Sequence, residues 1–113
     1  MIRGIGTDII ELSKIKFYSG KKYFLDKIFT KNELSYAKGN TAHLATTFAA
    51  KEAIFKALGK GWLDPREIEI TRSRSGKPGA VFLGKLKKKM KNKKVMLSLS
   101  YTKNYAVAFA VLK

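Results

Sequence analysis

TAHLATTFAAKEAIFKALG, residues 41–59, predicts one long helix whose apolar face is interrupted by charge. The apolar side chains recur at the i, i+4, i+7 spacing of an amphipathic helix, and they are Leu44, Phe48, Phe55 and Leu58. At about 100° per residue, Lys51 projects from the middle of this stripe, with Glu52 on its edge and Lys56 one turn further along. Charges beside a core-forming face are costly unless they are paired or bind something. We therefore expect the chemistry of the protein at this interruption.

A purely structural interpretation of the same pattern stays open. Glu52 and Lys56 have the i, i+4 spacing of an ion pair on the solvated shoulder of a helix. The Lys51 ammonium would then extend past the apolar side chains into water. Spacing alone does not decide between this arrangement and a binding site.

The first eleven residues, MIRGIGTDIIE, predict a strand. A period of two places Gly4, Gly6 and Asp8 on one face, together with Ile2 and Ile10. Because glycine weakens a strand, it often marks the close approach of a ligand or of another backbone. The alternative is a glycine-kinked edge strand with a solvated Asp8.

Capping signals divide the region between these two stretches into short helices. Ser13 is expected to cap a helix over residues 14–18, and another helical stretch follows over residues 23–28. Thr30 and Glu33 have the spacing of a capping box, which predicts a helix from residue 31. Thr41 is expected to cap the long helix, and Gly59 is expected to end it.

The C-terminal half predicts strands. In chain order we expect a loop over residues 62–66, strands over 68–70 and 80–83 joined by a turn over 75–78, and strands over 95–101 and 105–112. The order of a strand, helices, a long helix and four strands predicts an α+β fold in one domain, residues 1–113. Its mostly antiparallel sheet packs on the one long helix, with short helices beside it. Alanines on one face of the last strand suit tight packing against a helix.

The composition narrows the chemistry and the partners. The chain has 113 residues, no cysteine and a single histidine, His43, which excludes disulfides and Cys-based or multi-His metal sites. Lys and Arg number 24 against 8 Asp and Glu, a formal charge of +16 that attracts polyanions. Nucleic acid, an anionic membrane, or an acidic protein together with a phosphate-rich small molecule would all fit. No apolar run approaches the roughly 18 residues that span a bilayer, and a cytoplasmic location is expected.

Asp8 and Glu52 are candidate oxygen ligands for a hard cation. Mg²⁺ is typically held by one or two carboxylates, with water and substrate phosphates completing its shell. Lys56, one turn after Glu52, would lie beside such phosphates as a point charge. This combination suits the transfer of a phosphorylated group, where catalysis is mostly positioning and charge neutralisation.

Five stretches resemble one family across nearly the whole chain. They are GIGTDIIE at residues 4–11, FTKNEL at 29–34, FAAKEAIFKALG at 48–59, SGKP at 75–78 and SLS at 98–100. In this order they are similar to the signature stretches of the holo-(acyl-carrier-protein) synthases, the small bacterial 4′-phosphopantetheinyl transferases.

The resemblance implies an activity and a set of site residues. The enzyme would move 4′-phosphopantetheine from coenzyme A to a serine of an acidic apo-acyl carrier protein, with Asp8 and Glu52 as catalytic Mg²⁺ ligands and Lys56 as a catalytic cation. Lys14 would meet the carrier protein, and family members are trimers with the active site between subunits. The coenzyme A contacts implied are Lys51, Lys56, Gly59, Lys77, Pro78, Tyr101 and Thr102, although Lys51 would either contact phosphate or support the site.

Two positions depart from the family pattern. Thr47 stands where many members have an arginine, and Tyr101 stands where many have a histidine; both of those residues help to hold the nucleotide phosphates. Tyrosine donates one neutral hydrogen bond, and threonine cannot replace a guanidinium. Either nearby lysines compensate or coenzyme A binds less tightly, and we expect activity to be retained.

Two rival functions remain. The lysine-rich run KLKKKMKNKK at residues 85–94, read as a short amphipathic helix or an ordered loop, would give a nucleic-acid-binding module some affinity through counterion release. That module would not explain Gly6 and Asp8 or the charges around Glu52, and we expect no specific nucleic-acid partner and no membrane. An inactive, carrier-binding relative is supported only by Thr47 and Tyr101.

Overall fold

The computed structural model describes residues 1–59 and 63–113. Trp62, where the loop over residues 62–66 was expected to begin, lies outside this range. The α+β order expected from the sequence is confirmed. In chain order the elements are β1 (Gly4–Glu11), α1 (Leu12–Ser19), α2 (Lys22–Ile28), α3 (Lys31–Ala37), α4 (Thr41–Leu58), the 3-10 helix η1 (Pro65–Glu67), β2 (Ile68–Arg72), β3 (Pro78–Phe82), α5 (Gly84–Lys89), β4 (Val95–Tyr101) and β5 (Tyr105–Leu112).

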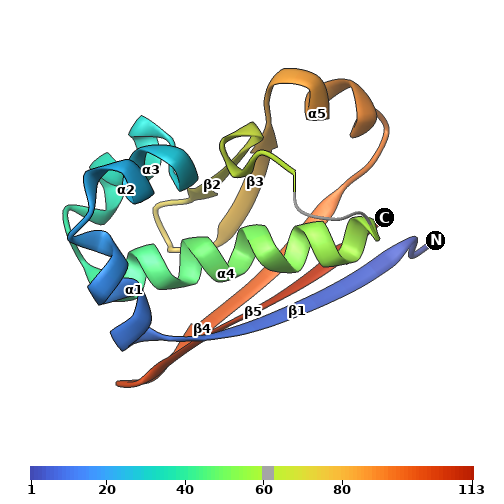
Figure 1. Cartoon of the computed structure of the whole chain (residues 1–113). Helices are drawn as coiled ribbons and strands as arrows, with labels where there is room; N and C mark the ends of the chain where they lie inside the picture. The colour runs from blue at the N-terminus through green and yellow to red at the C-terminus, as the bar shows by residue number, and fades with distance from the viewer. Residues whose placement is uncertain (60–62) are drawn as a thin grey trace.

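The strands form two antiparallel sheets. β1, β5 and β4 make a three-stranded sheet in that order, so β1 and β4 are its edges, and β2 pairs with β3 in a separate hairpin. Figure 1 shows α4 running along the three-stranded sheet, with α1, α2 and α3 gathered at its N-terminal end and the hairpin across α4 from β1. The chain ends meet at the opposite end of α4, where the backbone N–H of Arg3 donates to the carbonyl of Leu112 at 2.7 Å.

The glycines of β1 let the strand contact the backbone of α4. A Cβ at Gly6 would collide with the carbonyl oxygen of Ala53, and one at Gly4 would collide with that of Ala57. The alanines of β5, among them Ala108, are fully buried on the same side, as expected from their alternation. This close contact sets the distance between the strand that carries Asp8 and the helix that carries Glu52.

The helix ends differ in two places from the sequence-based predictions. α1 begins at Leu12 with Glu11 at the N-cap position, so Ser13 lies inside the first turn and is not the cap. Asn40 rather than Thr41 caps α4, because its side-chain oxygen accepts from the backbone N–H of His43 at 3.0 Å. The capping box at the start of α3 is confirmed, and so is the left-handed Gly59 that ends α4, with φ 69°.

The lysine-rich run at residues 85–94 forms a short amphipathic helix and turn. α5 buries Leu86, and Met90 follows it one turn later, also buried. The intervening lysines are exposed, which confirms the amphipathic interpretation. Among the described residues, no helix combines the length and the apolar character that crossing a bilayer requires.

Candidate active site

Three of the expected site residues line one pocket of about 280 Å³ beside β1, α1 and α4. They are Asp8 and Glu52, which were expected as metal ligands, and Lys14, which was expected to meet the carrier protein. The rest of the lining is Ile9, Ile10, Ile15, Tyr18, Phe24 and Phe48. A larger hollow of about 600 Å³, beside α2, α3 and η1, includes none of the expected site residues among its described lining.

Lys56 extends from α4 across to β1. Its Nζ donates to the carbonyl oxygen of Thr7 at 2.9 Å and lies 3.3 Å from an oxygen of Asp8. The Lys56 side chain is 55% exposed, whereas the Asp8 side chain is 15% exposed. The i, i+4 pair with Glu52 that the spacing left open is not among the ion pairs of the described residues. The ammonium therefore stays within reach of a ligand in solution.

The two carboxylates share a partly desolvated environment. Burial raises the pKa of Asp8, against the opposing effect of Lys56. Burial raises the pKa of Glu52 as well, the negative charge of Asp8 adds to that rise, and Lys56 again opposes it. One ammonium thus balances two acids, the charge of Asp8 disfavours the ionisation of Glu52, and a second cation would relieve the excess negative charge.

The donor set fits a hard divalent cation whose shell is completed from outside the protein. No group of three or more His, Cys, Asp or Glu residues suited to a metal occurs in the described part of the chain. Two carboxylates are what Mg²⁺ typically takes from a protein when water and substrate phosphates supply the other ligands. The charge excess at Asp8 and Glu52 points in the same direction.

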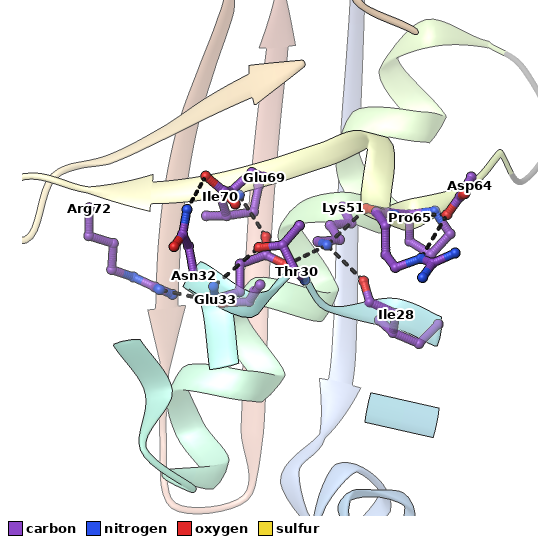
Figure 2. Close-up of polar contacts among 12 residues, drawn as sticks. Ile28, Thr30, Asn32, Glu33, Lys51, Asp64, Pro65, Glu69, Ile70 and Arg72 are labelled. Atoms are coloured by element: carbon purple, nitrogen blue, oxygen red, sulfur yellow. Dashed lines mark hydrogen bonds and ion pairs between the residues drawn. The ribbon is translucent and has the colours of Figure 1, made fainter. Parts of the chain in front are cut away.

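Lys51 does not line this pocket, and two of the expectations for it, a phosphate contact and a path into water, are wrong; the other, support of the site, stays a prediction. Its Nζ donates to a carboxylate oxygen of Glu33 at 2.6 Å and to the carbonyl oxygens of Ile28 and Pro65 at 2.8 Å each (Figure 2). The residue is 0% exposed. Three donors meet three acceptors, so no hydrogen of the ammonium is left for coenzyme A. Lys51 instead ties α2, α3 and η1 to α4.

Glu33 is the partner that sequence reasoning missed. One of its carboxylate oxygens accepts from Lys51 and from the backbone N–H of Thr30, and the other accepts from the backbone N–H of Ile70 at 2.7 Å (Figure 2). The capping-box motif accounted for the contact with Thr30 alone. The signal that could have found the pair was the burial of Lys51, since a buried ammonium requires a carboxylate and the chain has only 8 acidic residues.

Other expected coenzyme A contacts lie elsewhere in the chain. Pro78 and Tyr101 line a second pocket, of about 240 Å³, together with Arg72 and with Tyr36, His43, Thr46, Gly76 and Leu99. Lys77 and Thr102, which adjoin Pro78 and Tyr101 in sequence, are exposed, and so is Gly59 at the end of α4. The second pocket shares no lining residue with the pocket of Asp8, as far as the described residues show.

The fold is that of a family of transferases. The chain belongs to the 4′-phosphopantetheinyl transferase superfamily, which it matches over residues 4–110.

Relatives within that superfamily share one name. The holo-[acyl-carrier-protein] synthase of Clostridium kluyveri is 42% identical over 122 aligned residues, which cover 100% of this chain and 91% of the relative. The crystal structure of the Bacillus anthracis holo-(acyl-carrier-protein) synthase in complex with CoA (3′,5′-ADP) is 39% identical, with a TM-score of 0.84 over 99% of this chain and 96% of that one. The structure of the Neisseria meningitidis synthase has a TM-score of 0.90 at 34% identity, covering 100% and 99%.

Proposed function

We infer that the protein is a holo-(acyl-carrier-protein) synthase. It transfers 4′-phosphopantetheine from coenzyme A to a serine hydroxyl of apo-acyl carrier protein and releases adenosine 3′,5′-bisphosphate. Besides the family membership, the observation that carries this inference is the convergence of Asp8 and Glu52 at one pocket, with Lys56 in contact with Asp8. These residue types at one place serve phosphoryl-group transfer.

The reaction exchanges the phosphoanhydride bond of coenzyme A for a phosphate ester bond to serine. The serine oxygen bonds to the phosphorus that carries pantetheine, and the bond from that phosphorus to the bridging pyrophosphate oxygen breaks. The bridging oxygen leaves with its electron pair on the adenosine bisphosphate, and the serine proton is released. Lys56 lies where its charge stabilises the phosphate oxygens, because its ammonium is anchored to β1 yet exposed.

Asp8 and Glu52 are proposed to hold Mg²⁺ in this reaction. When bound, the ion supplies charge neutralisation at the pyrophosphate. The two side chains contribute by fixing the ion between β1 and α4, which the glycine contacts hold together. Asp8 also orients Lys56 through their 3.3 Å contact.

A homotrimer with shared active sites is part of the proposal. The pocket of Asp8 lies at β1 and that of Tyr101 at β4, which are opposite edges of the sheet. Head-to-tail association of copies would place one edge near the other and close into a ring. The outer face of the sheet is apolar and exposed, with Ile9 at 64% and Phe109 at 44%, which supports burial in an assembly.

The alanine face of β5 does not serve this interface. Ala106, Ala108 and Ala110 are fully buried on the side of α4, so this face is not available for a subunit contact. The opposite face, which carries Val107 and Phe109, is the available one. Light scattering of the purified protein tests the assembly, and a mass of three times 12.7 kDa is expected.

The carrier protein is proposed to dock over α1. Lys14 is exposed and lines the pocket of Asp8 and Glu52, so it can meet an acidic carrier while the carrier's serine enters. The formal charge of +16 favours capture of both an acidic protein and a phosphate-rich nucleotide. A cytoplasmic location stays a prediction.

Mass spectrometry of apo-carrier protein incubated with coenzyme A and Mg²⁺ tests the function. The wild type is expected to add the mass of 4′-phosphopantetheine to the carrier, and Asp8→Ala is expected to add none. If the wild type modifies no acyl carrier protein under these conditions, the synthase assignment is wrong. Loss of RNA affinity on charge reversal of residues 85–94, with no transfer by either protein, would favour the nucleic-acid-binding alternative.

A further inference from the structure

Arg72 ends β2 with its guanidinium turned onto the first turns of α4. Its Nη2 donates to the hydroxyl of Thr46 at 2.8 Å, and its Nη1 donates to the hydroxyl of Thr47 at 3.4 Å. The guanidinium carbon lies 5.1 Å from the centre of the Tyr36 ring. These contacts fix the plane of the group beside the second pocket, which Arg72 lines.

The contacts of Arg72 leave its charge uncompensated. The ion pairs found among the described residues do not include Arg72. Glu33, the carboxylate that acts on it electrostatically, is already bonded to Lys51 and to the backbone of Ile70. A half-buried guanidinium whose hydrogen-bond partners are neutral hydroxyls gains more from an anion than from those partners.

The pocket around Arg72 suits a phosphate. None of its described lining residues is acidic. Tyr101 adds a hydroxyl that can donate. The pocket volume of about 240 Å³ admits a phosphate group with part of a sugar. Arg72 supplies the fork of N–H donors that binds two phosphate oxygens at once.

We propose that Arg72 binds the 3′-phosphate at the nucleotide end of coenzyme A. The proposal rests on the proposed function, and it deepens that function by assigning one end of the substrate to one side chain. A consequence concerns Thr47, which lacks the charge expected at its position. The hydrogen bond between Thr47 and Arg72 puts a guanidinium from β2 at that position, so an arginine from another element provides the charge.

Binding of two nucleotides that differ only in the 3′-phosphate tests the assignment. Calorimetry would compare adenosine 3′,5′-bisphosphate with adenosine 5′-monophosphate, using the full-length protein without carrier. The wild type is expected to prefer the bisphosphate, and Arg72→Gln is expected to reduce that preference by about tenfold, the effect of one charge-assisted hydrogen bond. Its affinity for the monophosphate is expected to stay within twofold of the wild type's, on the order of experimental error.

Two further variants serve as controls. Arg74→Gln removes an exposed arginine from the same hairpin and is expected to keep the wild-type preference. Arg72→Lys keeps the charge without the fork, so it is expected to retain an intermediate preference, and it substitutes for Arg72→Gln if circular dichroism shows that variant unfolded.

The outcomes separate the two claims. An undiminished preference in folded Arg72→Gln or Arg72→Lys overturns the assignment, and an equal loss of both nucleotides overturns it too, because it would show a structural role. In either case, if the wild type still transfers phosphopantetheine to the carrier protein, the proposed synthase function stands and only the assignment of Arg72 is lost. If the wild type binds neither nucleotide and modifies no carrier, both claims fall.

Discussion

Lys51 and Lys56 lie on the same helix, five residues apart, and their surroundings are opposites. Lys51 is 0% exposed, and three acceptors take up its ammonium hydrogens. Lys56 is 55% exposed in its side chain and reaches two oxygens of β1. At about 100° per residue, the two side chains point roughly 140° apart around α4.

The comparison teaches how to separate a structural charge from a functional one. The pair of Lys51 and Glu33 is closed: every donor has an acceptor, and the pair connects five elements, namely α2, α3, α4, η1 and β2. The cluster of Asp8, Glu52 and Lys56 is open, because two acids share one exposed cation and burial raises the pKa of each acid. A closed ion pair contributes to the folded structure, whereas an open cluster carries unbalanced charge that a bound ligand or metal ion can neutralise.

The largest expected effect is on stability at the closed pair. Lys51→Met leaves the Glu33 carboxylate buried without its cation, and breaking a buried pair in this way costs about 3–5 kcal/mol. Urea unfolding followed by circular dichroism measures the loss. The double variant Lys51→Met/Glu33→Gln should recover part of it, because no charge is then left buried. A loss under about 1 kcal/mol, the scale of a surface ion pair, would show that the pair is not closed as described.

Replacement of Lys56, on another face of α4, by methionine should act on catalysis instead of stability. Lys56→Met is expected to lower the transfer rate by about 10²–10³, the effect of removing one group that stabilises charge in a transition state. Its free energy of unfolding should change by less than about 1 kcal/mol, because the pair with Asp8 is largely exposed on the lysine side. Steady-state kinetics and urea unfolding measure the two quantities. Equal destabilisation by Lys56→Met and Lys51→Met would abolish the contrast between the regions.

A smaller effect concerns the pH dependence of stability at the open cluster. The pKa of Glu52 is raised in the folded protein, so its ionised form opposes folding above that pKa, and the penalty disappears below the ordinary carboxyl range of about 4. Without divalent cations, Glu52→Gln should therefore be more stable than the wild type at neutral pH, and the difference should shrink as the pH falls.

Urea unfolding of both proteins in EDTA, at neutral pH and at about pH 4, checks this pH effect. Addition of Mg²⁺ at neutral pH should stabilise the wild type more than Glu52→Gln. If Glu52→Gln is less stable than the wild type in EDTA at neutral pH, the negative charge of Glu52 is not in excess at this cluster.

The smallest expected effect is at the rim of the open cluster. Lys14→Glu should raise the KM for the carrier protein by up to about fivefold with little change in kcat, because exposed charge pairs contribute at most about 1 kcal/mol. The effect should diminish as salt is added. Lys16→Glu, an equally exposed lysine of α1 that does not line the pocket, is the matched control. Equal effects of the two variants would assign the change to net charge rather than to position.

Much of the fold was predictable because its signals are local. Alternation, the capping box of Thr30 and Glu33, and the terminal Gly59 are set by the residues nearest in sequence, and the structure agrees with them. The cap of α4 falls on Asn40 instead of Thr41 because both residue types can cap. Which side chain meets a free N–H depends on where the preceding turn leaves the backbone.

The candidate site was predictable only in part. Asp8 and Glu52 stood out as acids beside glycine and alanine, and the structure places both in one pocket. Lys51 was assigned wrongly because periodicity shows that it points inward but not what covers it. The roles of Glu33 and Arg72 were missed because no local pattern marks their partners. These lie 18 and 37 residues away for Glu33 and 25 and 26 residues away for Arg72.

By itself the sequence determined the α+β order, the family, and the acids and lysines that stand apart from the apolar pattern, because these follow from residue types and short spacings. Only the tertiary structure decided which of those charges are closed off and which stay open. Burial and pairing depend on elements that meet in space, and the chain brings α3 to Lys51 and β2 to Thr47 without any signal in the residues between them.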